Sequence, residues 1–524
     1  MKGSSTGATL LVSGATVLLL WLALGLGAWP LLAVSCVPFF VYVFRASRKQ
    51  ALFCALLTGI GHFLILLYWI VFVLGQYGGL PLFFSVPALL LLCLYMTAYL
   101  VAFVLLTRLF VHRFPAAVSI WLLPVAWVAL DFLRSFFFSG FPWMDLGYGV
   151  AGLPILFQSA DLWGHYGLTF LIVQLNGLFA LALLNRTDMR MAVRLAAPVC
   201  VLCVATLLYS GWRWQQVKKN LIQAETLNVA VIQGNVAQGQ KWDPAVKVRT
   251  VQGYIGQSLQ LMRGTRSDFL RPDLIVWPET ALPFFPRNHP LLTPIRRFII
   301  DEQVMLLAGS PWYEEVEGEE EKYQLFNSSL LFDISGEIIA RTSKSHLVPF
   351  GEYVPFKRFL PFIAPLVEAV GDFTPGEIRN PPACKTTRIG VLICFESIFG
   401  DISRKWVDAG ASLLVNMTND AWYGNSSAPY QTLAMTRLRA VETRRSIVRS
   451  ANTGFSGFID PMGRVQQVSP LFVPWQATEK VAVMDERTFF VRGGYLFAPA
   501  CLVLACMGGL IALGRKIKNY NLLE

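Results

Sequence analysis

The sequence is poor in charged residues and in histidine. Only 15% of its 524 residues are Asp, Glu, Lys or Arg, whereas 55% are hydrophobic, and the chain has five histidines. In soluble domains about a quarter of all residues are charged. This composition therefore excludes an ordinary soluble protein and indicates a membrane protein with a water-exposed part. None of the histidines is framed with Ser and Asp in a way that predicts a serine-hydrolase triad.

Cysteine is not arranged for metal binding. The chain has nine cysteines with no metal-ligand spacing, so we expect neither a metal nor another cofactor. Seven lie in apolar stretches and are expected to pack as small hydrophobic side chains. The other two, Cys384 and Cys394, lie in the long polar segment, where a disulfide between them is one alternative.

Long apolar runs predict eight membrane helices. A helix needs about 20 apolar residues to span a bilayer, and 31–44 is the shortest candidate. The first run resembles a signal peptide, but a second apolar run follows it almost at once, which favours a membrane helix and a tight return. The predicted helices cover residues 8–29, 31–44, 51–74, 84–107, 117–137, 166–184, 195–212 and 494–513.

The basic excess is a topology signal. A net charge of +11 is compatible with nucleic-acid binding, but the excess lies in the N-terminal tail, three short loops (45–50, 108–116 and 185–194) and the C-terminal tail. The other short connections, 75–83 and 138–165, contain no Lys or Arg. The positive-inside rule therefore predicts cytoplasmic termini, and we expect membrane lipid rather than nucleic acid as a partner.

This topology predicts three parts of the chain. They are a membrane domain over 1–212, an extracytoplasmic domain over 213–493, and a last membrane helix with a cytoplasmic tail over 494–524. In a bacterium with two membranes the chain would lie in the inner membrane with the middle domain in the periplasm.

The middle segment alternates apolar, β-branched runs with helical patterns, which predicts an α/β domain with a largely buried sheet. The expected strands are Leu227–Gln233, Leu274–Trp277, Val304–Ala308, Ser329–Phe332, Ile338–Arg341, Ile389–Ile393, Leu413–Asn416, Ile447–Arg449 and Val481–Met484. The expected helices are 245–263, 291–302, 398–409 and 429–445.

Three strand ends carry residues suited to acyl-transfer chemistry. Cys394 follows the strand Ile389–Ile393 and precedes a helical pattern, as a nucleophile on a strand–turn–helix elbow does. A buried structural cysteine is the alternative reading of that residue alone. Glu279 follows another strand, and Lys344 follows a third, with Glu352 eight residues further on. Together these side chains supply a base, a cation and a thiol.

The motifs around these residues resemble those of a known superfamily. The segments Trp-Pro-Glu279, Lys344-Ser-His-Leu-Val-Pro-Phe-Gly-Glu-Tyr-Val-Pro and Cys394-Phe-Glu are similar to the nitrilase (carbon–nitrogen hydrolase) superfamily. Asn416-Met-Thr-Asn-Asp-Ala-Trp-Tyr-Gly and Asn452-Thr-Gly, with the flanking membrane helices, narrow the resemblance to the apolipoprotein N-acyltransferase family. The resemblance covers essentially the full length, and it implies an α-helical membrane bundle joined to an αββα sandwich.

The resemblance also implies a two-step reaction. Glu279 would deprotonate Cys394, which would attack a phospholipid acyl ester. Lys344 and the backbone N–H of Phe395 would hold the oxyanion. The thioester would then pass its acyl chain to the α-amino group of a diacylated apolipoprotein. Glu352 and Glu396 would support the site.

Substrate contacts are less sharply indicated. The resemblance points to Trp242, Trp143 and Tyr353, and an apolar, basic loop at 356–370 is expected to touch lipid. For Trp143 an interfacial aromatic belt is the alternative. In the membrane part, Asp131 and Arg134 are three residues apart on one helix, so we expect them to form a structural pair, with a role in substrate binding as the alternative.

The chain departs from the family pattern at Phe395, Thr432 and Arg444, where Tyr, His and Gly are expected. These differences bear on substrate contacts rather than on reaction class. Two other functions stay open at this point: a membrane-anchored amidase or nitrilase, and a transporter or lipid-binding scaffold with an inactive domain. Chain-length preference, headgroup preference, lipoprotein clients and oligomeric state have no signal in the sequence.

Overall fold

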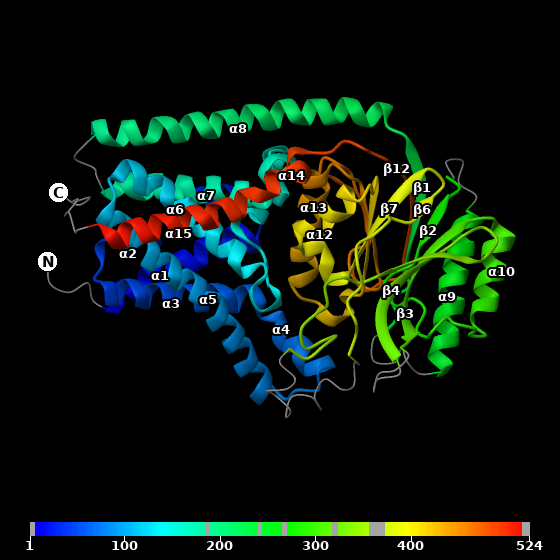
Figure 1. Ribbon diagram of the computed structural model, residues 1–524. Helices are drawn as coiled ribbons and strands as arrows, with labels where there is room; N and C mark the ends of the chain where they lie inside the picture. The colour runs from blue at the N-terminus through cyan, green and yellow to red at the C-terminus, as the bar shows by residue number, and fades with distance from the viewer. Residues whose placement is uncertain are drawn as a thin grey trace. The chain divides into compact units, whose positions relative to one another are not determined.

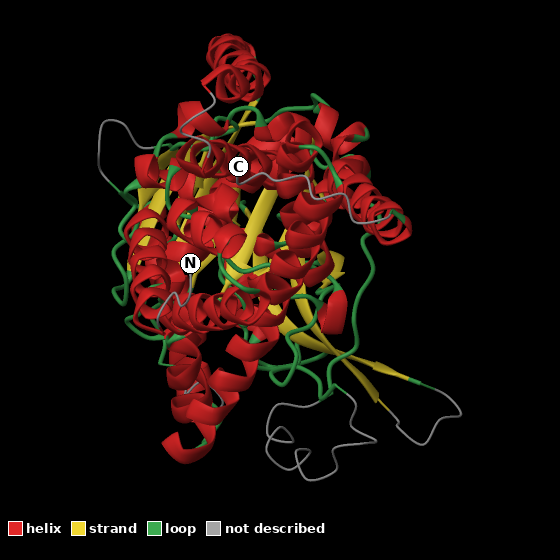
Figure 2. Cartoon of the chain, turned by 90° about the vertical axis from the view of Figure 1, so that its left-hand side faces the viewer, coloured by secondary structure: helices red, strands yellow, loops and turns green. Residues whose placement is uncertain are grey.

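The computed structural model describes residues 6–184, 189–237, 244–264, 270–316, 323–355 and 372–515. The chain divides into two compact units, each described separately below. The membrane unit consists of Met1–Val71, Pro81–Gln215 and Arg492–Glu524, and the sandwich unit of Phe72–Leu80 and Gln216–Val491. Among the described residues all strands belong to the sandwich unit, and the membrane unit contains helices only (Figure 1 and Figure 2).

The membrane unit is a set of long apolar helices. Seven helices of the described chain are long and apolar enough to cross a membrane, and the predicted run 31–44 corresponds to a shorter apolar helix over Trp29–Arg45. The structure therefore supports a membrane protein, with seven spanning helices rather than eight by this measure. The helices are α1 (Thr6–Leu20), α2 (Val37–Arg45), α3 (Arg48–Leu67), α5 (Leu82–Arg113), α6 (Ala116–Arg134), α7 (Ala160–Leu184), α8 (Met189–Gln223) and α15 (Phe497–Gly514), with the short α4 (Trp69–Phe72) after α3.

The sandwich unit contains two six-stranded sheets. One has the order β12-β1-β2-β3-β4-β5 and the other β11-β10-β9-β8-β7-β6. In the first sheet β1, β2 and β3 are parallel, and in the second β7, β8 and β9 are parallel. The first sheet is built from β1 (Thr226–Gln233), β2 (Leu274–Val276), β3 (Met305–Glu315), β4 (Tyr323–Phe332), β5 (Ile338–Ser343) and β12 (Trp475–Ala482). The second is built from β6 (Ala383–Cys384), β7 (Thr387–Ile393), β8 (Leu413–Thr418), β9 (Ile447–Ala451), β10 (Gly457–Ile459) and β11 (Val465–Val468).

Strand alternation builds two cores. Successive side chains of a strand point to opposite faces, so β1 contributes Ala230 and Ile232 to one core, and Val229 and Val231 to the other. The first core lies between the first sheet and helices α9 (Pro244–Met262) and α10 (Leu292–Glu302). The second joins residues of both sheets and is the middle of the sandwich.

Helices cover the outer faces of both sheets. Figure 1 shows α9 and α10 on one side of the strands, and α12 (Gly400–Asp408) and α13 (Ala428–Thr443) on the other. The layers are helix, sheet, sheet and helix, which confirms the αββα sandwich. A short helix, α14 (Phe489–Arg492), follows β12 at the end of this unit.

The predicted strands and helices of this segment are all present, with different bounds. The hairpin β3–β4 is longer than predicted because Gly309-Ser-Pro continues the strand instead of ending it. Only Val481 and Ala482 of the predicted last strand lie in β12, which begins at Trp475. The short strands β6, β10 and β11 were not predicted.

Candidate active site

Topology brings the three predicted strand ends to one edge of the sandwich. The strands β2 and β3 are parallel, and two antiparallel pairings make β5 run in the same direction as β3. Glu279 and Lys344 therefore follow strands that end at the same edge of the first sheet. At the end of β9, the Ser450 hydroxyl donates to the carbonyls of Ile232 and Val276, at 3.4 and 3.2 Å, so the parallel strands of both sheets end on the same side.

Cys394 occupies a strained elbow. It directly follows β7 and opens a 3-10 helix, Cys394–Ile398, which leads to α12. Its φ of 55° lies in the left-handed region, which a residue with a Cβ rarely adopts. Such strain persists where the surrounding structure imposes it, and here it holds a half-buried thiol at the end of the sheet.

Glu396 ties this elbow to the segment that carries the lysine. Its Oε1 accepts hydrogen bonds from the backbone N–H groups of Ser345 and His346, at 2.7 and 3.1 Å, and from the Ser345 hydroxyl at 2.6 Å. Its Oε2 accepts from the N–H of Ile393 at 2.7 Å. Burial raises the pKa of Glu396, and these donors oppose the shift. The carboxylate therefore links the end of β7, next to Cys394, to the two residues that follow Lys344.

An amide joins two carboxylates, and one of these carboxylates binds the lysine. Asn327, on β4, donates from Nδ2 to Oε1 of Glu279 at 2.8 Å and to Oε1 of Glu352 at 2.9 Å. The Lys344 Nζ lies 2.8 Å from Oε2 of Glu352, and the lysine is 1% exposed. The same Oε2 accepts from the N–H of Val348 at 2.8 Å. The two carboxylates are thereby fixed side by side in a buried site.

The electrostatics of the site keep the thiol neutral at rest. Burial raises the pKa of the Cys394 thiol to about 12, with a further increase from the Glu279 carboxylate and an opposing effect of Lys344. Burial disfavours the charge of Lys344, but the Glu352 carboxylate, with Cys394 and Glu279, raises its pKa above the ordinary value. At neutral pH the site thus holds a charged lysine and a protonated thiol beside a carboxylate that can accept the proton.

Two glycines permit close approach of the chain at this edge. A Cβ on Gly309 would lie 2.6 Å from the Pro278 carbonyl oxygen and from the Thr280 nitrogen, and 2.7 Å from the Cα of Glu279. A Cβ on Gly454 would lie 2.0 Å from Oδ2 of Asp420. Only glycine therefore fits at either position without displacing a residue of the site.

Comparison with known proteins assigns the chain to a family. A model of the apolipoprotein N-acyltransferase N-terminal domain matches residues 15–178, and a carbon–nitrogen hydrolase model matches residues 228–473. The chain is 37% identical to an apolipoprotein N-acyltransferase of Geobacter metallireducens over 94% of this chain and 93% of that protein. It is 31% identical to the Pasteurella multocida protein of the same name, over 90% of this chain and 89% of that protein.

The chain belongs to the apolipoprotein N-acyltransferase family. This confirms the family that the sequence motifs suggested, and it places a carbon–nitrogen hydrolase domain on the sandwich unit. The Cys394 elbow and the lysine–carboxylate cluster lie within the matched residues 228–473.

A second buried charged network, which was not predicted, lies next to the strand end that carries Cys394. Arg449, on β9, donates to Oδ2 of Asp420 at 2.8 Å and also contacts Oδ1 of Asn416. The Nδ2 of Asn416 donates to the Leu392 carbonyl at 2.9 Å, next to the strand end that carries Cys394. The signal was present in the sequence, because an arginine inside the apolar run of β9 requires a buried partner.

Asn327 was also missed. It stands in the sequence Phe-Asn-Ser-Ser, where polar residues in a strand are most simply read as a solvated face. The structure shows that Asn327, Ser328 and Ser329 are all buried. No local pattern distinguishes these two cases.

The segment Phe72–Leu80 was predicted as the end of the membrane helix 51–74 and the start of the short connection 75–83, yet it belongs to the sandwich unit. The Tyr77 hydroxyl donates to the Ala421 carbonyl at 2.9 Å, and its ring lies edge-on to Trp422 at a centroid distance of 5.0 Å. A Cβ on Gly424 would lie 2.4 Å from the ring of Phe72. The segment thus packs on the loop after β8, which carries Asp420.

The remaining predicted residues have varied positions. Trp242 and the loop 356–370 lie outside the described residues. Trp143 is fully buried in the membrane unit and packs on Trp69 at a centroid distance of 4.7 Å, so it is not part of a lipid-facing belt. Tyr353 is half-buried, and its carbonyl accepts from the Phe350 N–H at 2.8 Å.

Cys384 and Cys394 are both free, which removes the disulfide alternative. Phe395 is buried and packs edge-on against Phe399 at 5.1 Å. No group of three or more His, Cys, Asp or Glu in the described part of the chain is placed to hold a metal ion.

The departures from the family pattern have local explanations. Arg444 has a φ of 51° at the end of α13, where glycine is favoured, and its buried guanidinium donates to the Pro461 carbonyl at 2.9 Å. The Thr432 hydroxyl lies 3.3 Å from a guanidinium nitrogen of Arg449, so it takes part in the second network.

Proposed function

We propose that this chain transfers an acyl chain from a membrane phospholipid to the α-amino group of the N-terminal diacylglyceryl-cysteine of lipoproteins, through a thioester on Cys394. The observation that carries the proposal is the buried cluster of Glu279, Asn327, Glu352 and Lys344 at the sheet edge where the Cys394 elbow lies. The family of the chain supports the acceptor class.

In the first step Glu279 accepts the thiol proton as the sulfur of Cys394 attacks the ester carbonyl. Negative charge develops on the carbonyl oxygen, where Lys344 and the Phe395 N–H would stabilise it. Collapse of this intermediate breaks the ester C–O bond. The lysophospholipid oxygen takes the proton from Glu279 and leaves, so the thioester forms with protons and charge balanced.

In the second step the lipoprotein amine attacks the thioester carbonyl. Glu279 accepts a proton from the attacking nitrogen, the C–S bond breaks, and the thiolate is reprotonated. Glu352 holds Lys344 through both steps, and Glu396 keeps the lysine segment and the elbow together. Because water would convert the thioester to a fatty acid, the site must exclude it until the amine arrives.

The proposed location follows from the distribution of basic residues among the short loops. We propose an inner-membrane protein with cytoplasmic termini and the sandwich unit in the periplasm, because the basic residues of the short loops lie on the opposite side. Labelling of single introduced cysteines in the loops 75–83 and 108–116 of intact cells tests this, and labelling of the second loop alone by a membrane-impermeant reagent contradicts it.

Intact mass spectrometry tests the reaction. Purified wild-type protein incubated with phosphatidylethanolamine is expected to gain one acyl mass that hydroxylamine removes, whereas Cys394→Ser gains none. Cys384→Ser, which changes the other cysteine of the sandwich unit, is the matched control and is expected to behave as wild type. A diacylated lipopeptide should discharge the adduct and become triacylated.

Two outcomes contradict the proposal. An absent adduct with unchanged phospholipid excludes the thioester step. An adduct that water discharges as fast as the lipopeptide does, with release of free fatty acid, identifies a hydrolase of the amidase type instead.

A further inference from the structure

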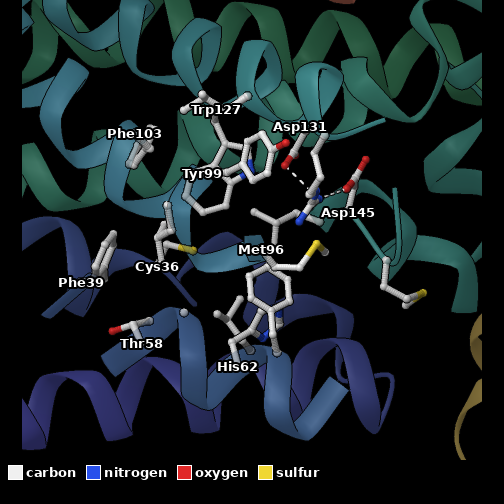
Figure 3. Close-up of a pocket in the computed structure, with 18 of the residues that line it drawn as sticks. Cys36, Phe39, Thr58, His62, Met96, Tyr99, Phe103, Trp127, Asp131 and Asp145 are labelled. Carbon is white, nitrogen blue, oxygen red and sulfur yellow. Dashed lines mark hydrogen bonds and ion pairs between the residues drawn. The ribbon is translucent and has the colours of Figure 1, made fainter. Parts of the chain in front are cut away.

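A pocket in the membrane unit has no role in the reaction described above. Side chains of α1, α2, α3, α5 and α6 line it, and all of them belong to the membrane unit. Apolar groups form most of its wall, including Phe39, Phe103 and Trp127, and polar groups gather at one side, where Figure 3 shows Asp131 and Asp145. A pocket with apolar walls and a few convergent polar groups is typical of a ligand site.

The polar side is a buried charge cluster. Arg134 lies between two carboxylates: it contacts Oδ1 of Asp131 at 3.0 Å and also contacts Oδ1 of Asp145, and dashed lines in Figure 3 mark these contacts. Oδ2 of Asp145 lies 3.1 Å from Nε2 of His165. Asp131 is 8% exposed and Arg134 5%, so the predicted pair forms but is part of a larger network.

The cluster leaves one donor and one acceptor unsatisfied. Among the described residues, Oδ2 of Asp131 and Nε of Arg134 have no hydrogen-bond partner, although both atoms are buried. Buried polar atoms of charged groups are costly to leave unpaired, so these two atoms point to a missing partner. The partner must donate to a carboxylate and accept from a guanidinium.

The net charge of the cluster determines whether a cation or an anion is favoured as the partner. Two carboxylates face one guanidinium, so with both carboxylates ionised and His165 neutral the cluster has a net charge of −1. A free anion such as phosphate would meet both carboxylates. A protonated primary amine restores the balance, and an oxygen atom near it in the same molecule would accept from Arg134.

The position and length of the pocket indicate that its ligand also carries an aliphatic chain. Arg134 is the last residue of α6, so the charges lie at the end of a membrane span and not at its centre. Met96 and Phe103 both line the pocket and are two turns apart on α5, so the pocket extends about 10 Å along that helix. This length of apolar wall suits part of an acyl chain.

We propose that this pocket binds an amphiphile with a primary ammonium group, an oxygen acceptor close to it and an aliphatic chain. Asp131 accepts from the ammonium, and Arg134 donates to the oxygen. Phosphatidylethanolamine and a diacylated lipopeptide both carry this chemistry, as ammonium with phosphate and as α-ammonium with a peptide carbonyl. Naming these two molecules rests on the proposed function, whereas the charge and shape of the site do not.

Photo-crosslinking tests the site directly. Full-length Cys394→Ser protein, which cannot form the thioester, is incubated with phosphatidylethanolamine or with a diacylated lipopeptide, each carrying a diazirine in an acyl chain. Peptides that contain Met96, Phe103 and Trp127 are then quantified for label. Because this protein reports binding without turnover, a failure of binding and a failure of acyl transfer are measured separately.

The expected result is labelling of the pocket peptides that depends on the amine. N-acetylation of either probe should lower labelling about 10–150-fold, the effect of losing one charge-assisted hydrogen bond. If only the phospholipid labels the pocket, the occupant is the donor lipid. If only the lipopeptide labels it, the occupant is the acceptor. If both label it, the pocket recognises the primary amine that the two molecules share. The comparison of free and acetylated probes needs no substitution in the membrane unit.

Substitutions give a second measure. Asp131→Asn should lower labelling by the free-amine probes to the level of the acetylated ones. The matched control is Asp161→Asn, which changes a buried carboxylate of the same unit whose oxygens contact Tyr209 and Arg213, at 2.9 and 2.6 Å. Pocket labelling that acetylation and Asp131→Asn leave unchanged, or label that never enters these peptides, overturns the proposal.

Discussion

Replacing Glu279 by Gln is expected to change two properties of Cys394 in opposite directions. The thiol has a pKa of about 12, mainly because of burial and secondarily because of the Glu279 carboxylate. At pH 7 about one molecule in 10⁵ then carries a thiolate, so the resting nucleophile is the thiol. Removing the carboxylate charge lowers the pKa and makes the free thiolate more abundant.

The same substitution removes the proposed base. General-base catalysis contributes about 10²–10⁴-fold, so acylation of Cys394 by phosphatidylethanolamine should fall by that factor in Glu279→Gln. Alkylation by iodoacetamide, which needs only thiolate, should instead become faster at a given pH. Lys344→Met is expected to slow both reactions, because Lys344 lowers the thiol pKa and would stabilise the oxyanion.

The assay measures both rates on the same preparation. Alkylation of Cys394 is followed by peptide mass spectrometry from about pH 6 to pH 10, and acylation by intact mass in a single turnover. Alkylation of Cys384, which is buried on β6, serves as an internal control for opening of the sandwich and should be equal in all variants. If Glu279→Gln slows alkylation as well, the carboxylate activates the resting thiol and the reasoning is wrong. If it leaves acylation unchanged, Glu279 is not the base.

Three further predictions concern residues that support the site or the fold. Asn327→Leu removes the amide that joins Glu279 to Glu352. Single-turnover acylation should therefore fall about 10–150-fold, the effect of one lost charge-assisted hydrogen bond. An unchanged rate would exclude a positioning role for Asn327. Gly309→Ala should displace Glu279 and lower acylation more than it lowers the melting temperature, because the new Cβ meets three backbone atoms. Its control, Gly253→Ala, has no neighbour within 4 Å and lies in α9, where alanine should stabilise by about 0.5–1 kcal/mol. Arg444→Gly relieves a left-handed φ but removes a buried guanidinium and its bond to Pro461, so thermal unfolding should show a net loss of about 1–2 kcal/mol, and a gain would mean that backbone strain dominates.

The sequence was sufficient for the residues that stand at strand ends. Glu279 and Cys394 each follow an apolar, β-branched run, Lys344 follows a shorter and more polar strand, and the change of pattern after each strand marks where the side chain leaves the sheet. The elbow at Cys394 was predictable for this reason. Its left-handed φ was not, because strain of this kind is imposed by the surrounding structure.

The sequence was insufficient where a residue acts through partners far along the chain. Asn327 is 48 residues from Glu279 and 25 from Glu352, and its role follows from strand pairing that local pattern does not contain. Likewise, the predicted pair of Asp131 and Arg134 was correct as a local contact. Asp145, which completes the cluster, comes from a different segment of the membrane unit.

The arrangement of charges would allow one site to serve both proposed half-reactions. At rest the cluster holds the ammonium of Lys344 with the carboxylates of Glu279 and Glu352, beside a neutral thiol. In the proposed first step the proton would move from Cys394 to Glu279, and one negative charge would move the other way, from the carboxylate to the sulfur and then to the carbonyl oxygen, so the net charge of the buried site would stay constant. A net change of charge in a buried site is unfavourable because the new charge is not solvated by water, and internal transfer of the proton avoids such a change. Departure of the lysophospholipid would return Glu279 to the carboxylate form, which is the form that the incoming amine requires. In the proposed mechanism the same residue would therefore be ready for the second step without a proton from water, and a site that must exclude water could complete the cycle.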